Sequence, residues 1–395
     1  MNGQRRRYTS RIRYSLALGP EPSTLPTERP RRDSVTRVSA ILTSWAPGRV
    51  NLIGEHTDYS GGLVLPAAIQ LGVTAGVDAV AGTITLRSSQ LGPGEPFAPD
   101  GGGEPVAGWA CYGQAVAAEL AELGRPVVGM TARIDSTVPT GAGLSSSAAL
   151  EVAIALALCA VADFEVEPLE LALACQRAEL RAVGKPCGIL DQAASVLGRP
   201  GVAILLDCAT LEHRDVHVPD EAALLVVDSG IGHDDAGPAY AQRRQELEHA
   251  MALVGATRST EIDPARLEGL DDVSARRLRH VVSENRRVLD FAAAIEKRDL
   301  AEAGRLLLAG HASLRDDYEV SIPELDLLVE LADDAGAYGA RLLGGGFGGA
   351  ILALVDTDRA EEVASAVVER YRDETGGEAT PLVAHPSAGA SVRRA

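Results

Sequence analysis

The chain has few of the features that mark secreted, membrane-spanning or nucleic-acid-binding proteins. Its five cysteines are odd in number and form no Cys-x-x-Cys pair, which disfavours disulfides and a zinc site. The longest unbroken apolar run, residues 152–162, is far shorter than the roughly 20 residues that a bilayer span requires. Lysine occurs only at Lys185 and Lys297, and the net charge of −18 repels nucleic acid and anionic membranes. We therefore predict a cytoplasmic protein with neither a membrane nor a nucleic-acid partner.

Residues 1–38 differ in composition from the rest of the chain. They carry nine arginines against three acidic residues, are rich in proline and show no sustained apolar period. They also lack the long apolar core of a secretory signal. We predict a disordered Arg/Pro-rich tail; the alternatives are a nucleic-acid or targeting arm, or a start codon placed too far upstream.

The remaining residues are numerous and apolar enough for two domains, since 46% of the chain is hydrophobic. Strand-like alternation over residues 64–89 favours an antiparallel sheet over parallel β-α-β winding. A long helical region follows the strand expected at residues 222–230. We predict an α+β fold with an N-terminal domain at residues 39–220 and a C-terminal domain at residues 221–395.

Local patterns predict further elements. Helices are expected from Trp109 to Leu123, behind the serines at 145–147, from Pro168 to Val183, and just after residue 188. Strands are expected at residues 39–53, interrupted by Pro47 and Gly48, and at residues 130–139 and 202–208, with a glycine hairpin at residues 339–355. The helical period recurs at residues 239–255, 276–310 and 322–335.

The segment PTGAGLSSS, residues 139–147, has the composition of an anion-binding turn. Gly141 and Gly143 let the backbone come close to a ligand, and the helix that follows presents unpaired N–H groups at its positive end. Ser145, Ser146 and Ser147 add hydroxyl groups. No Gly-Lys-Ser/Thr follows, so this is not a Walker A sequence. A helix capped after a glycine turn explains the segment equally well.

Other polar positions have ordinary explanations when each is taken alone. GRVNLIGEHTDYSGG, residues 48–62, places consecutive polar and ionisable residues directly after an apolar run. Asp191 in GILDQ could be a helix cap, Glu179 could lie on a solvated helix face, and LLGGGFGG at 342–349 could be a structural hairpin. Together they offer a phosphate-binding helix end, oxygen donors suited to Mg²⁺, a carboxylate base and an arginine, as phosphoryl transfer requires.

These segments resemble the galactokinases of the GHMP small-molecule kinase superfamily. GRVNLIGEHTDYSGGLVLP resembles the galactokinase signature, VPTGAGLSSSAALEVA the superfamily phosphate loop and GARLLGGGFGG its third motif, and HASLRDDYEVSIPELDLLV is similar as well. The resemblance runs from about residue 39 to residue 383. It implies a two-domain α+β GHMP kinase fold, in which the N-terminal domain has a mixed sheet with helices and the C-terminal domain is of α/β type. The active site is expected in the cleft between the domains. The implied activity is ATP-dependent phosphorylation of D-galactose at its 1-hydroxyl.

The resemblance also implies roles for individual residues, each at the position that matches a family motif. Asp191 matches the catalytic acid and Arg49 the arginine that stabilises the transition state. The implied sugar ligands are Glu55, His56, Thr57, Asp58, Gly188 and Tyr240. The implied nucleotide loop is Gly141, Ala142, Gly143, Leu144, Ser145, Ser146 and Ser147, and Ser147 and Glu179 match the Mg²⁺ ligands. The cofactors implied are ATP as co-substrate and Mg²⁺, and we expect a monomer.

One segment departs from the family pattern. Gly232 stands where a basic residue is usual, in the segment that leads to Tyr240. A kinase for another sugar, such as N-acetylgalactosamine or arabinose, is an alternative, because pocket size cannot be read from sequence. A non-catalytic galactose sensor that regulates transcription is another, although such relatives are expected to lack the Ser-Ala step that is present here at Ser147 and Ala148. A structural or binding module is a third alternative, and the motifs support it less than they support the sensor.

Overall fold

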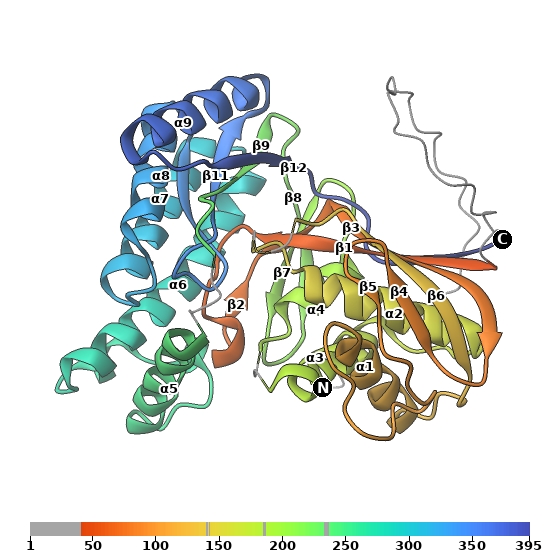
Figure 1. The fold of residues 1–395 in the computed structure, drawn as a ribbon. Coiled ribbons are helices and arrows are strands. Elements are labelled where there is room, and N and C mark those ends of the chain that lie inside the picture. The colour runs from red at the N-terminus through yellow and green to blue at the C-terminus, as the bar shows by residue number, and fades with distance from the viewer. Residues whose placement is uncertain (1–40, 140, 142, 185–186, 233–236) are drawn as a thin grey trace, which may run out of the picture.

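The computed structural model describes residues 41–139, 141, 143–184, 187–232 and 237–395. The tail predicted at residues 1–38 lies outside this range. The described chain forms three sheets and a set of helices that lie in two halves, one on each side of the view in Figure 1. The prediction of an antiparallel sheet in place of β-α-β winding is confirmed, since β4 with β6 is the one parallel pair between the described strands.

The N-terminal half is built on a six-stranded sheet of order β13-β1-β3-β6-β4-β5. Its strands are β1 (Leu42–Asn51), β3 (Pro66–Ala81), β4 (Thr85–Ser88), β5 (Gly92–Pro93), β6 (Gly129–Ser136) and β13 (Ser391–Arg394). The last strand returns from the end of the chain to pair with β1. The predicted division of the chain near residue 220 stays a prediction.

Strand β1 passes through the point where a break was expected. It pairs with β3 on both sides of Pro47 and Gly48, and its register shifts between Pro47 and Arg49, which marks a bulge. A side chain at Gly48 would meet the Leu144 carbonyl oxygen at 2.6 Å, so the strand lies directly against the glycine-rich turn. The bulge thus carries Arg49 past that turn without ending the strand.

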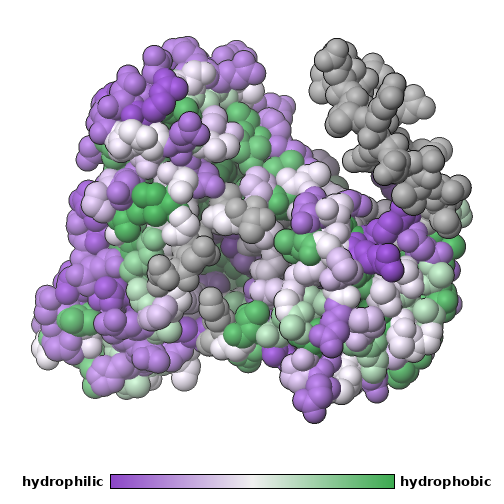
Figure 2. Space-filling view, viewed as in Figure 1, coloured by the Kyte–Doolittle hydropathy of each residue, from purple (hydrophilic) through white to green (hydrophobic). Residues whose placement is uncertain are grey.

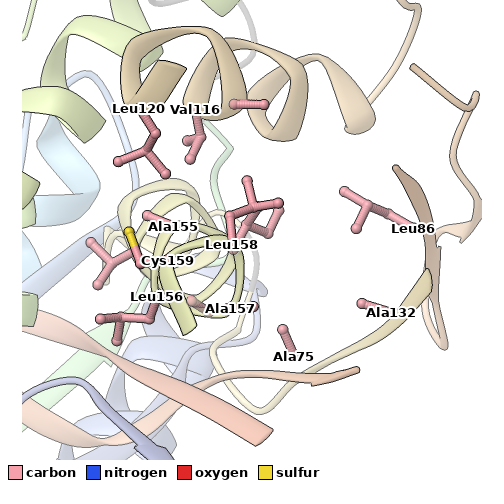
Figure 3. Close-up of a cluster of buried hydrophobic side chains, with 14 of the residues drawn as sticks. Ala75, Leu86, Val116, Leu120, Ala132, Ala155, Leu156, Ala157, Leu158 and Cys159 are labelled. Atoms are coloured by element: carbon pink, nitrogen blue, oxygen red, sulfur yellow. The ribbon is translucent and has the colours of Figure 1, made fainter. Parts of the chain in front are cut away.

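Four helices cover one face of this sheet. They are α1 (Ala110–Glu122), α2 (Ser146–Val161), α3 (Pro168–Val183) and α4 (Leu190–Leu197). Apart from its first two serines and Glu151, helix α2 is apolar, and it is buried between α1 and the strands, as Figure 3 shows for Leu158 and its neighbours. The bounds expected for these helices are confirmed to within two residues.

The C-terminal half is built on a four-stranded antiparallel sheet of order β10-β11-β9-β12. Its strands are β9 (Ala222–Asp228), β10 (Gly339–Leu343), β11 (Ala350–Asp356) and β12 (Thr380–Ala384). Helices α5 (Gly237–Leu253), α6 (Asp272–Glu296), α7 (Leu300–Asp316), α8 (Pro323–Asp334) and α9 (Ala360–Thr375) pack around it. Short 3₁₀ helices lie at Asp58–Ser60, Ser259–Glu261, Pro264–Leu267 and Thr357–Arg359. The glycine hairpin predicted between β10 and β11 is confirmed.

The continuous helical period at residues 276–310 was wrong as a single element. The region holds two helices, α6 and α7, separated at Arg298 and Asp299. Arg298 adopts a left-handed backbone with φ of 59°, and the Asp299 side chain accepts a hydrogen bond from the Glu302 N–H. A cap therefore starts a new helix, which folds back along α6, where the apolar pattern alone predicted continuity.

A small sheet of β2 (Leu63–Val64), β7 (Val202–Asp207) and β8 (His213–His217) completes the fold. A buried cluster that includes Val50, Leu52, Phe291 and Leu343 joins the two halves next to the polar turn at residues 52–62. The five cysteines are free thiols. In the described part of the chain, no helix is long and apolar enough to cross a membrane.

Candidate active site

A cavity of about 200 Å³ opens between the two halves, where Figure 2 shows the surface hollowed. Its wall comes from the β1 end, the turn that follows, the start of α4, helix α5 and the glycine hairpin. The lining residues are Arg49, Asn51, Gly54, Glu55, His56, Asp58, Tyr59, Cys187, Gly188, Leu190, Asp191, Tyr240, Gly344 and Gly345. The fold therefore gathers segments that are far apart in sequence around one polar space.

The turn at residues 52–62 is folded tightly enough to bring the side chains of Glu55, His56 and Asp58 to the cavity. Gly54 has φ of 104°, and a side chain there would meet the Leu63 carbonyl oxygen at 2.7 Å. His56 also has a left-handed backbone, with φ of 63°. The Thr57 Oγ1 lies 2.8 Å from the Gly54 carbonyl oxygen and 2.7 Å from that of Leu63. Thr57 thus braces the turn from inside and does not line the cavity, although we predicted it there.

Glu55 is a buried carboxylate with every oxygen engaged. Arg341, fully buried on β10, lies 2.6 Å from its Oε2, and the Gly344 N–H donates to Oε1 at 3.0 Å. The Asn51 side chain also donates to Oε2. Burial raises the pKa of Glu55, and the Arg341 charge opposes that shift. The geometry thus fixes an acceptor at the cavity wall.

Asp58 and Gly188 fit against each other. A side chain at Gly188 would meet the Asp58 Oδ2 at 1.9 Å, so only glycine leaves room for this carboxylate. Burial, together with the nearby charge of Asp191, raises the pKa of Asp58 to about 6. Two carboxylates that repel each other thus face the same space, and hydrogen-bond donors placed between them would stabilise both.

Arg49 and Asp191 form the central ion pair. Arg49 Nη2 lies 2.6 Å and Nε 2.7 Å from Asp191 Oδ1, while Nη1 donates to the Gly143 carbonyl at 2.5 Å. The other oxygen of Asp191 accepts from the Ser145 hydroxyl. One arginine therefore joins the strand bulge, the glycine-rich turn and the start of α4.

The glycine-rich turn enters α2 with an open helix end. Gly141 and Gly143 have φ of 83° and 68°, and Ser145, the N-cap, has φ of 57°. Among the described residues, no side chain caps the α2 N-terminus, because the Ser145 hydroxyl bonds to Asp191 instead. Leu144 is buried behind the turn, Ser146 begins the helix, and Ala142 lies outside the described residues. Unpaired N–H groups at a helix N-terminus are suited to bind an anion.

Ser147 and Glu179 lie close together beneath this turn. The Ser147 hydroxyl donates to Glu179 Oε1 at 3.0 Å, and the Gln192 amide donates to Glu179 Oε2 at 2.7 Å. Gln192 also donates to the fully buried Glu151 at 3.1 Å. Burial and the charge of Asp191 raise the pKa of Glu179. In the described chain, no three His, Cys, Asp or Glu side chains form a complete metal site.

Tyr240, which we predicted as a sugar ligand, lines the cavity from α5. Its ring lies 5.7 Å from that of His56 and would touch a side chain placed at Gly345. The structure thus brings Arg49, Glu55, His56, Asp58, Gly188, Asp191 and Tyr240 to one cavity, with the glycine-rich turn, Ser147 and Glu179 on its flank.

Sequence reasoning missed several residues that hold these groups in place. They are Arg341, Glu284, His280, Gln192, Glu151, Tyr59 and Tyr318. Arg341 left a signal, because a cation inside the apolar strand GARLL needs a buried partner. Glu284 and His280 left no such signal in the sequence, since charged residues are common on a long helix. In the structure, Glu284 accepts a hydrogen bond from the Gly54 N–H, and His280 bonds to the Glu55 carbonyl.

Known protein families match three parts of this chain. Residues 37–79 match a galactokinase galactose-binding signature, residues 111–199 the GHMP kinases N-terminal domain and residues 291–373 the GHMP kinases C-terminal domain. A galactokinase of Mycobacterium bovis is 43% identical over 330 residues, which cover 82% of this chain and 91% of that one. A galactokinase of Roseiflexus is 42% identical over 355 residues, 87% and 91% of the two chains.

The solved Lactococcus lactis galactokinase complexed with galactose superposes with a TM-score of 0.84 at 33% identity. It covers 89% of this chain and 95% of its own. A Methanococcus jannaschii mevalonate kinase, at 19% identity and a TM-score of 0.61, shares the fold alone. The two-domain α+β fold expected from the sequence is confirmed. This chain belongs to the galactokinase family of the GHMP kinases.

Proposed function

We propose that this chain transfers the γ-phosphoryl group of ATP to the 1-hydroxyl of D-galactose, giving galactose 1-phosphate and ADP, the first committed step of galactose catabolism. The observation that carries the proposal is the cavity itself, where the turn of the galactose-binding signature faces the Arg49–Asp191 pair beside the open end of α2. The galactokinase relatives support galactose as the acceptor.

The sugar would lie against the turn at residues 52–62. Glu55 and Asp58 accept hydrogen bonds from sugar hydroxyls, and His56 and Tyr240 supply further polar contacts from the cavity wall. Such a site rejects a sugar with a missing or inverted hydroxyl, because a buried polar group is then left without a partner. Gly188 contributes the space in which Asp58 lies.

Asp191 and Arg49 would perform the chemical step. The 1-hydroxyl gives its proton to Asp191 as its oxygen forms a bond to the γ-phosphorus, and the bond from that phosphorus to the ADP oxygen breaks. Arg49, fixed by Asp191 and the Gly143 carbonyl, directs a guanidinium toward the charge that develops on the phosphoryl oxygens. The nucleotide phosphates would lie on the N–H groups of the turn from Gly141 to Ser147 and on the end of α2.

Ser147 and Glu179 would hold Mg²⁺, and the residues present fit this ion. Both offer hard oxygen donors within 3.0 Å of each other, and the buried charge of Glu179 lacks a cationic partner among the ion pairs of the described chain. Mg²⁺ usually takes one or two protein oxygens and completes its shell with phosphate and water. When bound, the ion neutralises charge on the β- and γ-phosphates.

The deciding experiment measures ADP release from Mg·ATP with galactose, glucose, N-acetylgalactosamine and arabinose as separate acceptors. We expect turnover with galactose and much weaker turnover with the others. If only another sugar of the panel is turned over, that sugar and not galactose is the substrate. Galactose binding without turnover would favour the sensor, although the Ser147-Ala148 step argues against it. Size-exclusion chromatography of the same sample tests the predicted monomer.

A further inference from the structure

The imidazole of His56 is held by the protein at one nitrogen and left open at the other. Its Nδ1 lies 2.8 Å from the hydroxyl of Tyr59, and that hydroxyl lies 2.8 Å from the hydroxyl of Tyr318. The Nε2 atom is buried but has no hydrogen-bond partner among the described residues. Because His56 lines the cavity, this unpaired nitrogen is available to a ligand there.

Several segments fix the two tyrosines. Tyr318 is fully buried, and the centre of its ring lies 4.6 Å from that of His56 and 4.7 Å from that of His280, with the planes tilted. The guanidinium of Arg244 lies 5.0 Å from the centre of the Tyr59 ring. Burial raises the pKa of both phenols, so both hydroxyls keep their protons and can donate. The hydrogen-bonded side chains of Tyr318, Tyr59 and His56 therefore form a row from the segment after α7 to the cavity wall.

The direction of these hydrogen bonds follows from the balance of donors and acceptors. Burial lowers the pKa of His56 to about 3, so the ring is neutral and carries one proton. Among the described residues, the buried hydroxyl of Tyr318 has one hydrogen-bond partner, the Tyr59 oxygen, so Tyr318 donates to Tyr59 and the proton of Tyr59 is left for Nδ1 of His56. A neutral ring with Nε2–H leaves Nδ1 to accept from the Tyr59 hydroxyl. Tyr59 then accepts from Tyr318.

The cavity also needs a donor at this place. Glu55, Asp58 and Asp191 all contribute carboxylates, which accept the proton of a sugar hydroxyl but cannot satisfy its lone pairs. An Nε2–H group on His56 supplies such a donor. The opposite tautomer would add another acceptor to a wall that already holds three carboxylates.

We propose that the hydroxyl pair of Tyr59 and Tyr318 fixes His56 as the Nε2–H tautomer and so makes it a hydrogen-bond donor to one hydroxyl of the sugar. The sugar contact rests on the proposed function, whereas the tautomer is a property of the free protein. Tyr59 and Tyr318 act as positioning residues, because they work through His56.

The test combines ring ¹⁵N NMR of the sugar-free protein with galactose binding by calorimetry and steady-state kinetics. In the wild type we expect the protonated-nitrogen signal of His56 at Nε2 and the unprotonated one at Nδ1. Tyr59→Phe should produce a mixture of tautomers and weaken galactose binding by about tenfold, with a much smaller change in kcat. Tyr318→Phe should weaken binding by roughly twofold to threefold, since it acts through Tyr59.

The matched control is Tyr371→Phe, which removes a buried hydroxyl that donates to the Ser229 carbonyl just after β9 in the C-terminal half. It should leave the His56 signals and galactose affinity unchanged. Deoxygalactoses identify the sugar hydroxyl that His56 contacts. The deoxygalactose that lacks this hydroxyl should bind the wild type weakly, and its affinity should not fall further in Tyr59→Phe.

Two results would overturn the proposal. One is a proton on Nδ1 in the wild type, and the other is a Tyr59→Phe protein with the wild-type tautomer and wild-type affinity. If the wild type binds no galactose at all, the proposed function fails together with the sugar contact, while the NMR spectrum still decides the tautomer.

Discussion

The turn at residues 52–62 lines the cavity and the turn at residues 141–147 lies on its flank, and the two turns are held from different sides. The first is held largely by the C-terminal half, since Glu284 accepts from the Gly54 N–H, and His280 and Arg341 hold Glu55. The second is held from the N-terminal half, through Arg49, Asp191 and Glu179.

The two turns also differ in how completely their polar groups are paired. Both oxygens of Glu55 are bonded, and His56 keeps one open nitrogen. At the other turn, no side chain of the described residues caps the N–H groups of α2. The polar groups on the sugar side are therefore held by protein contacts before any ligand binds. On the phosphate side, the partial positive charge of the N–H groups at the start of α2 is left for a bound ligand to balance. Substitutions on the sugar side and on the phosphate side should therefore affect different measured quantities.

Asp191→Asn should have the largest effect on this comparison, because Asp191 touches both sides. We expect kcat to fall by about a thousandfold, since general-base catalysis contributes typically 10²–10⁴-fold, while galactose affinity changes only a few-fold. Ser145→Ala, which removes only one bond to the carboxylate, is the milder control. Rate measurement and calorimetry decide, and turnover near wild type would remove Asp191 from the mechanism.

Glu179→Gln tests the phosphate side alone. The amide keeps the shape but loses the charge, so we expect roughly 100-fold lower turnover and a higher Mg²⁺ concentration for half-maximal rate. Galactose affinity should stay at the wild-type value. Titrating Mg²⁺ at saturating ATP and galactose measures this, and an unchanged Mg²⁺ dependence would exclude Glu179 as a ligand.

Arg341→Met tests the sugar side. It leaves the Glu55 carboxylate buried without its cation, which costs roughly 3–5 kcal/mol of unfolding free energy, and it should raise the KM for galactose roughly tenfold. The KM for ATP should change little.

Arg125→Met is its matched control. Arg125 is equally buried but bonds to backbone carbonyls away from the cavity. It should lower stability, as measured by urea unfolding, without moving the galactose KM. Equal KM changes in the two variants would mean that Arg341 acts only through general stability.

Asp58→Asn gives the smallest expected effect and depends on pH. The folded-state pKa of about 6 lies above the ordinary 3.8, so the ionised carboxylate destabilises the folded chain above pH 6, and this penalty fades as the pH falls. The variant should gain about 2 kcal/mol of unfolding free energy at pH 8 and about half of that at pH 5. It should also bind galactose more weakly. An equal gain at both pH values would contradict the assignment of the shift to Asp58.

Several secondary-structure elements of this protein could be predicted from the chemistry of neighbouring residues alone. Pro168 and Gly184 mark the ends of α3 because proline fits a first turn and glycine a left-handed cap. The break between α6 and α7 was not readable, because the apolar period continues through Arg298 and Asp299 and only the cap geometry ends it. Thr57 was placed with the sugar ligands because it stands among them in sequence, but its hydroxyl points to backbone carbonyls.

The sequence by itself determined the family, the chemistry of the motifs and most of the helices and strands, because these depend on residue types at short spacing. Only the tertiary structure decided which buried groups hold the site: Arg341 against Glu55, Gln192 between Glu151 and Glu179, and the hydroxyls of Tyr59 and Tyr318 behind His56. Apart from His56 and Tyr59, three residues apart, these partners come from elements far apart in the chain. A hydrogen bond depends on distances that folding sets and that sequence spacing does not record.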